Sequence, residues 1–324
     1  GQILFGTNGN GIDIFSPQSG LIGGYRATPG QHGSLPDSTI LALAQTKDGS
    51  IWAGTQLAGV VRLLPGSKDW QSIPGLPGAQ VRRFLEAGDG NLWVATDRGA
   101  ARWQAGQSRF EAVPDQNGTP MTNAVITLAQ DREGRVWAGS DNGLWVMPVD
   151  GKGLQAIPAA PLRASGLGSG YVTGLLVDQA GRLWLATDKG MERLLCWDGK
   201  NAEFEHISDL LGQSGQALGA NLMEDRSGRI WTEAAIIDPN TMRLVSLSKA
   251  DGTDSGASWL GAYGKTRDGL LLFGGTLGVT IINPILLPGP RYAFIESKVA
   301  IWSSRHDYPY FGFMGFFLPL RFEE

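Results

Sequence analysis

The sequence has few of the residues that usually build catalytic or metal centres. Among its 324 residues there are one cysteine, Cys196, and three histidines, His32, His206 and His306. A single cysteine excludes an intrachain disulfide framework and any site with several cysteine ligands. The histidines lie in separate parts of the chain without the spacing of metal ligands. The sequence therefore predicts no metal site and no cofactor.

Charged residues and long apolar runs are also scarce. Charged side chains make up 18% of the chain, and the formal net charge is −4. A nucleic-acid partner is not expected, because its phosphates would need a basic stripe that the sequence lacks. The longest apolar stretch, residues 308–320, is interrupted by glycine and proline. It is shorter than the roughly 20 residues that cross a bilayer, so no transmembrane helix is predicted.

Glycine and tryptophan are abundant, and they occur in a repeat. Five segments place a glycine three residues before a tryptophan: KDGSIWAGT, GDGNLWVAT, REGRVWAGS, QAGRLWLAT and RSGRIWTEA. Two further copies have leucine in place of tryptophan, with Leu4 after Gly1 and Leu272 after Gly269. Successive copies are 41 to 48 residues apart. A period of this length is typical of propellers and other repeat architectures.

Each copy reads as four short strands. In one copy, residues 40–45, 51–55, 60–64 and 70–73 are apolar or alternating, and Lys47-Asp48-Gly49 forms a turn between the first two. We therefore predict an all-β fold, a seven-bladed β-propeller of four-stranded antiparallel blades. The repeated tryptophans are interpreted as packing between blades rather than as a stacking array for sugars or bases. The glycine-rich segment 166–170 precedes an expected strand and not a helix, so it is a blade connection and not a phosphate-binding loop.

The blades resemble a known family. Residues 34–63 (SLPDSTILALAQTKDGSIWAGTQLAGVVRL) and 270–284 (LLLFGGTLGVTIINP) are similar to two-component regulator propeller repeats, in which an apolar strand and an acidic turn precede LWxGT. The resemblance covers roughly residues 1–284. In that family the propeller is the extracytoplasmic sensor of a membrane receptor, followed by an immunoglobulin-like domain, a membrane helix and a histidine kinase or diguanylate cyclase.

The resemblance implies a periplasmic, non-enzymatic sensor for a small molecule or glycan. It implies membrane attachment only through other parts of the receptor, and it is compatible with receptor dimerisation. Two departures are visible: blade six (residues 230–239) lacks the GTxxG loop, and the tail after Pro290 does not resemble the immunoglobulin-like domain. Two other functions stay open, a protein-interaction scaffold and an enzyme of the virginiamycin B lyase type. The enzyme would need a histidine and metal carboxylates at the ring centre, and the histidines fall outside the innermost strands of blades two to seven.

The start of the chain raises the question of how the propeller closes. Gly1 aligns with the turn glycines, so the chain begins between the first and second strands of blade one, and the innermost strand of this blade must come from elsewhere. We predict that a propeller spans residues 1–306, that Lys298–Ser303 pairs with Ile3–Thr7 to complete blade one, and that residues 307–324 form a non-repeat tail. The alternative is that the missing strand lies upstream of Gly1.

Candidate binding residues follow from the position seven residues before each turn glycine. These are expected to face the pore: Ala42, Arg83, Thr127, Gly174, Asn221 and Ala262. Arg83 is the only charge in the row, and Arg82 lies beside it. We predict that they receive an anionic group near Tyr171, Asn221 and Trp259, the alternative being that Arg83 pairs with a carboxylate of a neighbouring blade or with pore waters.

Acidic residues follow the second strand of several blades. Glu233 is expected near the pore mouth because the turn of blade six is short. Asp97, Asp141 and Asp188 directly follow the WxxT/S element. They are interpreted as turn residues that accept hydrogen bonds from their own backbone, in preference to ligands of calcium or of a polyol.

Overall fold

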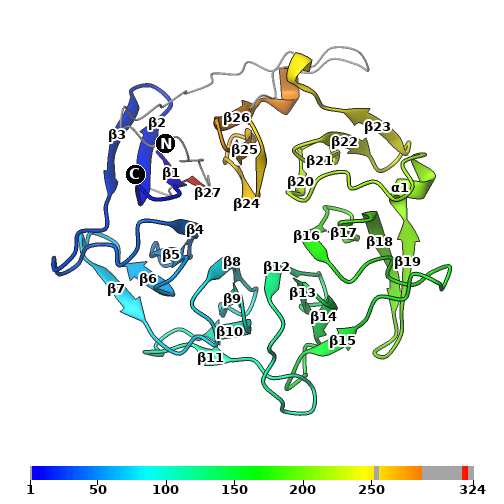
Figure 1. Cartoon of the computed structure of the whole chain (residues 1–324), viewed down its shortest axis with the longest axis horizontal. Helices are drawn as coiled ribbons and strands as arrows, with labels where there is room; N and C mark the ends of the chain where they lie inside the picture. Colours follow the sequence, from blue (N-terminus) through cyan, green and yellow to red (C-terminus); the bar gives the residue numbers. More distant parts are fainter. Residues whose placement is uncertain (1, 252–254, 287–315, 320–324) are drawn as a thin grey trace. The chain divides into compact units, whose positions relative to one another are not determined.

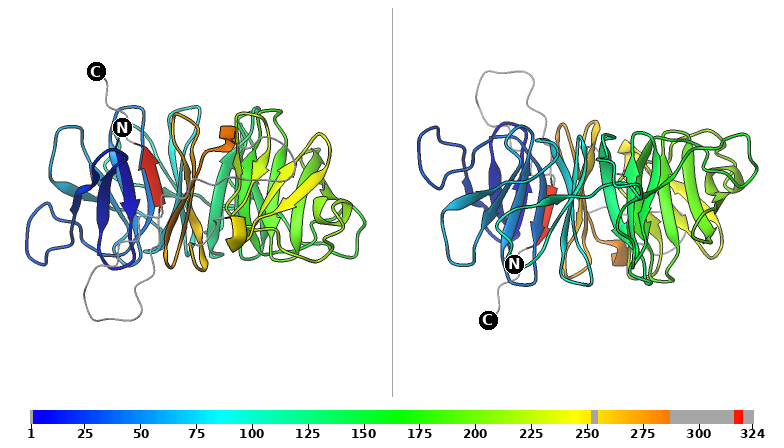
Figure 2. Two further views of the ribbon diagram at one scale, coloured as in Figure 1. Left: turned by 90° about the horizontal axis from the view of Figure 1, so that it is seen from above. Right: turned by 90° about the horizontal axis from the view of Figure 1, so that it is seen from below.

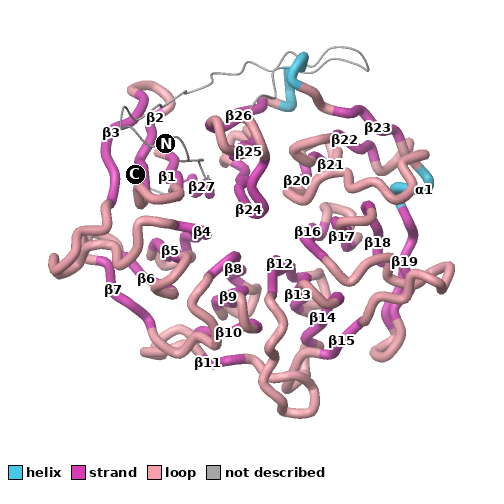
Figure 3. The backbone as a smooth tube through the Cα atoms, in the orientation of Figure 1, coloured by secondary structure: helices cyan, strands magenta, loops and turns pink. Residues whose placement is uncertain are grey.

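The computed structural model describes residues 2–251, 255–286 and 316–319. The strands form seven separate antiparallel sheets, six with four strands and one with three among the described residues (Figure 1). The prediction of a seven-bladed β-propeller is confirmed. Helix is confined to α1 (Ile207–Leu210) and two 3-10 turns, η1 (Lys249–Asp251) and η2 (Pro284–Leu286), within the part described (Figure 3).

The chain divides into two compact units. The central unit is Pro74–Ser246, and the terminal unit is Gly1–Ile73 with Leu247–Glu324. Blades three to six make up the central unit. Their strands are, for blade three, β8 (Val81–Glu86), β9 (Leu92–Thr96), β10 (Gly99–Trp103) and β11 (Glu111–Ala112); for blade four, β12 (Val125–Gln130), β13 (Val136–Ser140), β14 (Gly143–Met147) and β15 (Gln155–Ile157); for blade five, β16 (Val172–Val177), β17 (Leu183–Thr187), β18 (Gly190–Trp197) and β19 (Ala202–His206); and for blade six, β20 (Met223–Glu224), β21 (Ile230–Trp231), β22 (Ala235–Asp238) and β23 (Arg243–Ser246).

The terminal unit holds blades one, two and seven. Their strands are β1 (Ile3–Gly6), β2 (Ile12–Ser16), β3 (Gly20–Tyr25) and β27 (Phe316–Pro319) in blade one; β4 (Ile40–Gln45), β5 (Ile51–Thr55), β6 (Val60–Leu63) and β7 (Trp70–Ile73) in blade two; and β24 (Ser258–Lys265), β25 (Leu271–Gly275) and β26 (Gly278–Ile282) in blade seven. In its core, Ile3 of blade one packs with the buried Leu272 of blade seven.

The repeated glycine is required by the turn between the first and second strands. The six turn glycines from Gly49 to Gly269 have φ between 80° and 94°, a left-handed conformation that a side chain disfavours. Each glycine N–H donates to the carbonyl three residues earlier, over 2.8 to 3.1 Å. The spacing of the repeat is thus fixed by a backbone conformation.

The repeated tryptophans are core residues, as the sequence predicts. Trp52, Trp137, Trp184 and Trp231 are 0% exposed, and Trp93 is 3% exposed. Rings buried to this extent cannot stack on a sugar or a base, so their role is to pack neighbouring sheets.

The closing strand lies elsewhere than the sequence analysis places it. β27 pairs antiparallel with β1, with Ile3 opposite Pro319 and Gly6 opposite Phe316. The two side views show β27, in red, alongside the blue strands of blade one (Figure 2). The other edge of β1 is paired with β2. The edge predicted for Lys298–Ser303 is therefore taken by residues of the predicted tail, while Lys298–Ser303 itself lies outside the described residues.

Blade six is irregular, as its sequence predicts. Its first two strands, β20 and β21, have two residues each, whereas β16 and β17 of blade five have six and five. Three residues separate β21 from β22, against two between the corresponding strands of blades three to five, so this turn is not the short one that the sequence predicted. The blade whose sequence departs from the repeat directly after its tryptophan is thus also the blade with the shortest pairing between its first and second strands.

Candidate ligand-binding site

The first strands of blades two to five share a β-bulge that the sequence did not reveal. The pairing of the first with the second strand shifts by one residue at Leu41, Arg82, Ile126 and Thr173. A bulge bends the strand and re-aims side chains, and it is common beside binding sites. In blade three this extra residue is Arg82, one of the two arginines singled out above.

Arg82 has incomplete hydrogen bonding. Its Nη2 donates to the Oε1 of Gln80 over 2.8 Å. Its Nε is buried, and no residue in the described part of the chain accepts a hydrogen bond from it. A buried donor without an acceptor costs about 1–3 kcal/mol, so this position favours an acceptor that is supplied from outside. Arg83 lies next to it on β8, half-buried, opposite Ala95 of β9.

Thr127 provides a second incomplete group, on the first strand of the next blade. β12 lies beside β8 in the central unit (Figure 1). Thr127 is 3% exposed, and its Oγ1 is buried without a partner within the residues described. The sequence places Thr127 in the pore-facing row but gives it no role. One signal in the sequence could have identified it. Thr127 carries a hydroxyl group at the position that Arg83 occupies in the first strand of the preceding blade.

Asn221 and Glu233 are brought together in blade six. The two carboxylate oxygens of Glu233 accept the backbone N–H groups of Ala220 and Asn221, each over 3.0 Å. Glu233 thereby holds the residues that lead into β20, and Asn221 is only 1% exposed. Both oxygens of Glu233, which the sequence predicted to lie near the pore mouth, thus accept hydrogen bonds from the backbone of blade six.

Tyr171 and Trp259 complete the predicted set. Tyr171, directly before β16, is 41% exposed, and its N–H donates to the Oγ of Ser169 over 3.1 Å. Trp259 is half-buried on β24 and belongs to the terminal unit, whereas the other five residues belong to the central unit. The structure thus joins Arg82 with Arg83 and Asn221 with Glu233.

Two of the aspartates after the second strands, Asp97 and Asp188, have a structural role, but not through their own backbone. The Oδ1 of Asp97 accepts the N–H of Gln80 over 3.1 Å, and Asp188 accepts the hydroxyl of Ser169. In both cases the carboxylate holds the segment that leads into the first strand, as Glu233 does in blade six. Gln80 therefore links the Asp97 turn to Arg82. Among the described residues, no group of three or more histidine, cysteine, aspartate and glutamate side chains is arranged to hold a metal ion.

A buried network supports the first two strands of blades four to six. In each blade one aspartate, Asp131, Asp178 or Asp225, accepts the indole N–H of the repeated tryptophan over 2.6 to 2.8 Å. The same carboxylate accepts the Nε of an arginine four residues later, over 2.5 to 2.6 Å. The signal is DxxGRxW, which occurs three times in the sequence. Sequence reasoning missed it because only the glycine and the tryptophan were compared.

The pKa of Asp178 reflects this network. Burial alone would raise the pKa of the carboxyl, but hydrogen bonds from Trp184 and Arg182 and the arginine charge outweigh it and hold the pKa below its usual range. The ionised form of Asp178 is therefore the form that the fold stabilises.

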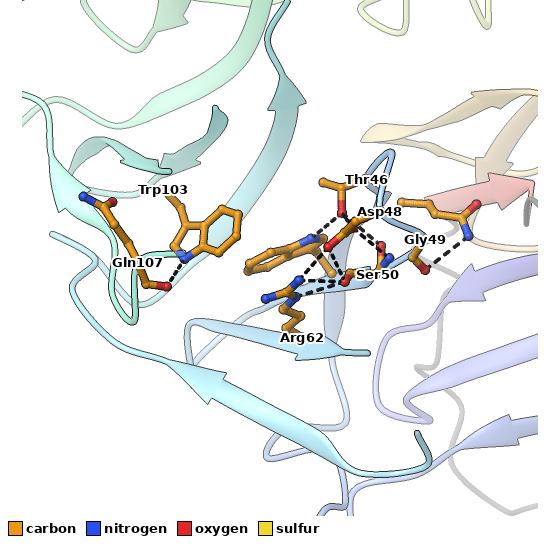
Figure 4. Close-up of polar contacts among 9 residues, drawn as sticks. Thr46, Asp48, Gly49, Ser50, Arg62, Trp103 and Gln107 are labelled. Atoms are coloured by element: carbon orange, nitrogen blue, oxygen red, sulfur yellow. Dashed lines mark hydrogen bonds and ion pairs between the residues drawn. The ribbon is translucent and has the colours of Figure 1, made fainter. Parts of the chain in front are cut away.

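Blades two and three show how the network varies. In blade two Thr46 takes the place of the aspartate and accepts the indole N–H of Trp52 over 3.0 Å. Figure 4 shows Arg62 directed at Asp48 and Ser50, at 2.6 and 2.9 Å. In blade three the two positions are Ala87 and Asn91. Figure 4 also shows Trp103, whose indole N–H donates to the carbonyl of Gln107 over 2.8 Å.

Turns of neighbouring blades are joined by hydrogen bonds in the central unit. The N–H of Gly88 in blade three donates to the side chain of Gln130 in blade four over 2.7 Å. Arg132 of blade four donates to the carbonyl of Gln179 in blade five. The N–H of Gln179 donates in turn to Glu224 of blade six over 2.8 Å. These bonds connect four successive blades at the ends that carry the glycine turns.

Comparison with known proteins agrees with the repeat. Four segments, residues 34–56, 75–98, 120–146 and 166–189, match the family model of the two-component regulator propeller. No curated protein sequence matches the chain. None of the helices in the described residues is long and apolar enough to cross a membrane.

Three solved structures illustrate the similarity of fold. The extracellular domain of a putative hybrid two-component system from B. thetaiotaomicron is 14% identical, with a TM-score of 0.60, over 86% of this chain and 43% of that chain. PorZ, a surface component of the type-IX secretion system of Porphyromonas gingivalis, is 18% identical, with a TM-score of 0.55, over 87% and 41%. Virginiamycin B lyase from Staphylococcus aureus is 14% identical, with a TM-score of 0.53, over 76% and 82%. This chain thus spans less than half the length of the first two.

Proposed function

We propose that this chain, which belongs to the two-component regulator propeller family, is a non-catalytic, extracytoplasmic ligand-sensing domain of a membrane signal-transduction receptor. The matched repeats and the likeness to the extracellular domain of a putative hybrid two-component system support this role. The location is periplasmic, and the kinase or diguanylate cyclase transmitter belongs to other parts of the receptor. The protein partner in this proposal is a second copy of the receptor, through dimerisation.

The ligand is an organic acid or a glycan with a carboxylate, such as a uronate. The observation that carries this proposal is a pair of buried polar atoms, Arg82 Nε and Thr127 Oγ1, on adjacent first strands. Neither atom has a hydrogen-bond partner within the described residues. A guanidinium binds a carboxylate through charge-assisted hydrogen bonds, and a threonine hydroxyl can bind either a carboxylate or a sugar hydroxyl. Arg83 adds positive charge beside Arg82 on β8. The exposed ring of Tyr171 offers a face on which a sugar can pack.

A thermal-shift screen tests this proposal directly. Galacturonate and glucuronate are compared with galactose and glucose, which have the same ring but no carboxylate. A ligand at 100 times its Kd stabilises the fold by about 2.7 kcal/mol, which the melting temperature readily reports. We expect stabilisation by acids and none by the neutral sugars. Equal shifts with both series would contradict a site built for an anion.

Variants then assign the site. Arg82→Gln and Thr127→Val should each weaken binding of the acid found in the screen, Arg82→Gln by about tenfold or more because a charge-assisted hydrogen bond is lost. The control is Arg109→Gln, which removes the same charge from an exposed position in the same blade. If Arg82→Gln and Arg109→Gln bind equally well, Arg82 is not part of the site.

A lyase is the second candidate, because this chain covers 82% of virginiamycin B lyase and shares its fold. Such an enzyme would need a histidine and metal carboxylates at the ring centre, whereas His206 is on β19, the fourth strand of blade five. The test is incubation of the protein with virginiamycin B and Mg²⁺, followed by mass spectrometry of the antibiotic. Ring opening at a rate above that of the buffer blank would favour the enzyme over the sensor.

A further inference from the structure

Blade five contains a buried carboxyl group that is only half satisfied. Glu192 on β18 is 3% exposed. Its Oε1 accepts the N–H of Gly168 over 2.8 Å, while its Oε2 is buried and has no hydrogen-bond partner within the residues described. A Cβ at position 168 would lie 2.6 Å from this Oε1, so a larger residue there would require the Glu192 side chain to shift.

A histidine adjoins the same carboxyl group. His206 lies opposite Glu192 in the pairing of β18 with β19, and its Nδ1 is 3.8 Å from Glu192 Oε1. Its Nε2 lies 3.2 Å from the carbonyl oxygen of Ala164, which can only accept, so Nε2 carries a proton. The other ring nitrogen, Nδ1, is the one that faces Glu192. Histidine is the side chain whose charge ordinarily changes between pH 5 and 8.

These contacts hold one segment against the hairpin of β18 and β19. Residues 158–170, which connect β15 to β16, are here called the connecting segment. Gly168 and Ala164 attach it to Glu192 and His206, the carbonyl of Ser165 accepts the N–H of Phe204 over 2.9 Å, and Arg163 donates to the carbonyl of Ala202. The segment ends at Ser169 and Gly170, directly before the exposed Tyr171.

The charges around the pair favour uptake of a proton. Burial raises the pKa of Glu192, the hydrogen bond from Gly168 and the charge of His206 oppose this rise, and Asp209 of α1 adds to it. On the neighbouring positions of β18 and β19, Arg193 and Glu205 pair with each other. Arg163 of the connecting segment is bound to a carbonyl. None of these contacts gives Glu192 a fixed countercharge.

We propose that Glu192 and His206 form a proton-operated clasp that holds the connecting segment on blade five at mildly acidic pH and loosens it as the pH rises. With both groups deprotonated, a buried carboxylate faces the lone pair of a neutral imidazole. One proton removes this unfavourable arrangement, whether it rests on Nδ1, where it makes an ion pair, or on the carboxyl group, which becomes neutral. The proton thus belongs to the pair.

The sign follows from the raised pKa of Glu192. A group whose pKa is higher in the folded than in the unfolded protein stabilises the fold below its unfolded value, and that stabilisation is lost as the pH rises through the folded value. Because the connecting segment leads to Tyr171, the clasp would also regulate ligand binding there, and this part of the inference rests on the proposed function. The clasp itself can be measured without any ligand.

Hydrogen–deuterium exchange of the whole chain tests the clasp. Protection of residues 158–170 is measured at pH 5.5 and 7.5 and corrected for the intrinsic exchange rate. We expect more protection at pH 5.5 than at pH 7.5, because the pKa of Glu192 is raised in the folded protein. Peptides that cover Trp137 serve as an internal reference and should not change. Equal protection of the segment at both pH values overturns the proposal.

Two variants assign the proton to this pair. Glu192→Gln keeps an acceptor for the Gly168 N–H but cannot ionise, so protection should become independent of pH. His206→Gln should reduce the pH dependence at least severalfold, with Glu205→Gln and His32→Gln as matched controls that keep it. A pH dependence that survives in folded Glu192→Gln overturns the proposal. If Glu192→Gln does not fold, the pH dependence of protection is compared between His206→Gln and His32→Gln. Equal pH dependence in these two variants overturns the proposal.

Discussion

The indole N–H of Trp184 donates a 2.8 Å hydrogen bond to Asp178, and both side chains are buried in the first hairpin of blade five. Arg182 donates to the same carboxylate oxygen over 2.6 Å. The tryptophan thus has a polar partner in the core, and the aspartate has the positive charge that a buried carboxylate needs.

Asp178→Asn should lower the free energy of unfolding by about 2–4 kcal/mol, because the arginine loses its countercharge in a buried site. Urea denaturation followed by tryptophan fluorescence measures the change. The control is Asp89→Asn, an exposed turn residue in blade three. A loss no larger than that of the control would mean that the network contributes nothing to stability.

Acidification should remove the contribution of Asp178. Its pKa is lower in the folded protein than its usual value, so the stabilisation is present above the unfolded pKa of about 3.9 and is lost as the pH falls through the folded value. The difference in unfolding free energy between the wild type and Asp178→Asn should therefore shrink below about pH 4. A difference that stays constant down to pH 2.5 would contradict this assignment.

The aspartate–arginine pair can be introduced into blade three, where Ala87 and Asn91 occupy the places of the aspartate and the arginine. Ala87→Asp alone should destabilise the protein by about 1–3 kcal/mol, since a carboxylate is buried without its arginine. Adding Asn91→Arg should recover most of that loss. A double-mutant cycle with thermal unfolding measures the coupling, and additive effects would show that the pair does not interact.

Gly90 isolates the conformational cost of the turn. Its φ is 83°, and a Cβ there would meet no atom within 4 Å. Gly90→Ala should cost about 1–2 kcal/mol from backbone strain alone, and Gly90→Asn less, because asparagine tolerates the left-handed region. Chemical denaturation of both variants gives the comparison. Equal losses for alanine and asparagine would point to a cause other than φ.

The repeat was predictable because two local requirements recur in five of the blades. Gly134 must adopt a positive φ, and Trp137 must fill the space between sheets, so both leave a fixed mark in the sequence. The closing strand leaves no such mark. Residues 316–319 pair with β1 through backbone groups, which almost any apolar segment offers, and no turn glycine follows them. The more β-branched Lys298–Ser303 was for that reason the better match by sequence.

The candidate site was predictable only in part. Arg83 was found because it is the only charge in its row. The importance of Arg82 and Thr127 depends on hydrogen bonds that no described residue makes with them. The bulge at Arg82 changes which side chains of β8 share a face of the sheet. A prediction that assumes strict alternation of side chains between the two faces cannot anticipate it. Glu233 was expected near the pore mouth, but nothing in the sequence indicated that both of its oxygens accept hydrogen bonds within its own blade.

The pairing of β1 with β27 sets the order in which the molecule can be completed. Gly6 and its partner Phe316 are 310 positions apart in the chain. During synthesis β1 leaves the ribosome long before β27 exists, whereas each blade of the central unit can form from one continuous stretch. Until β27 arrives, β1 keeps an open edge that invites pairing with other strands. Blade one therefore sets the period during which the newly made chain depends on protection from aggregation.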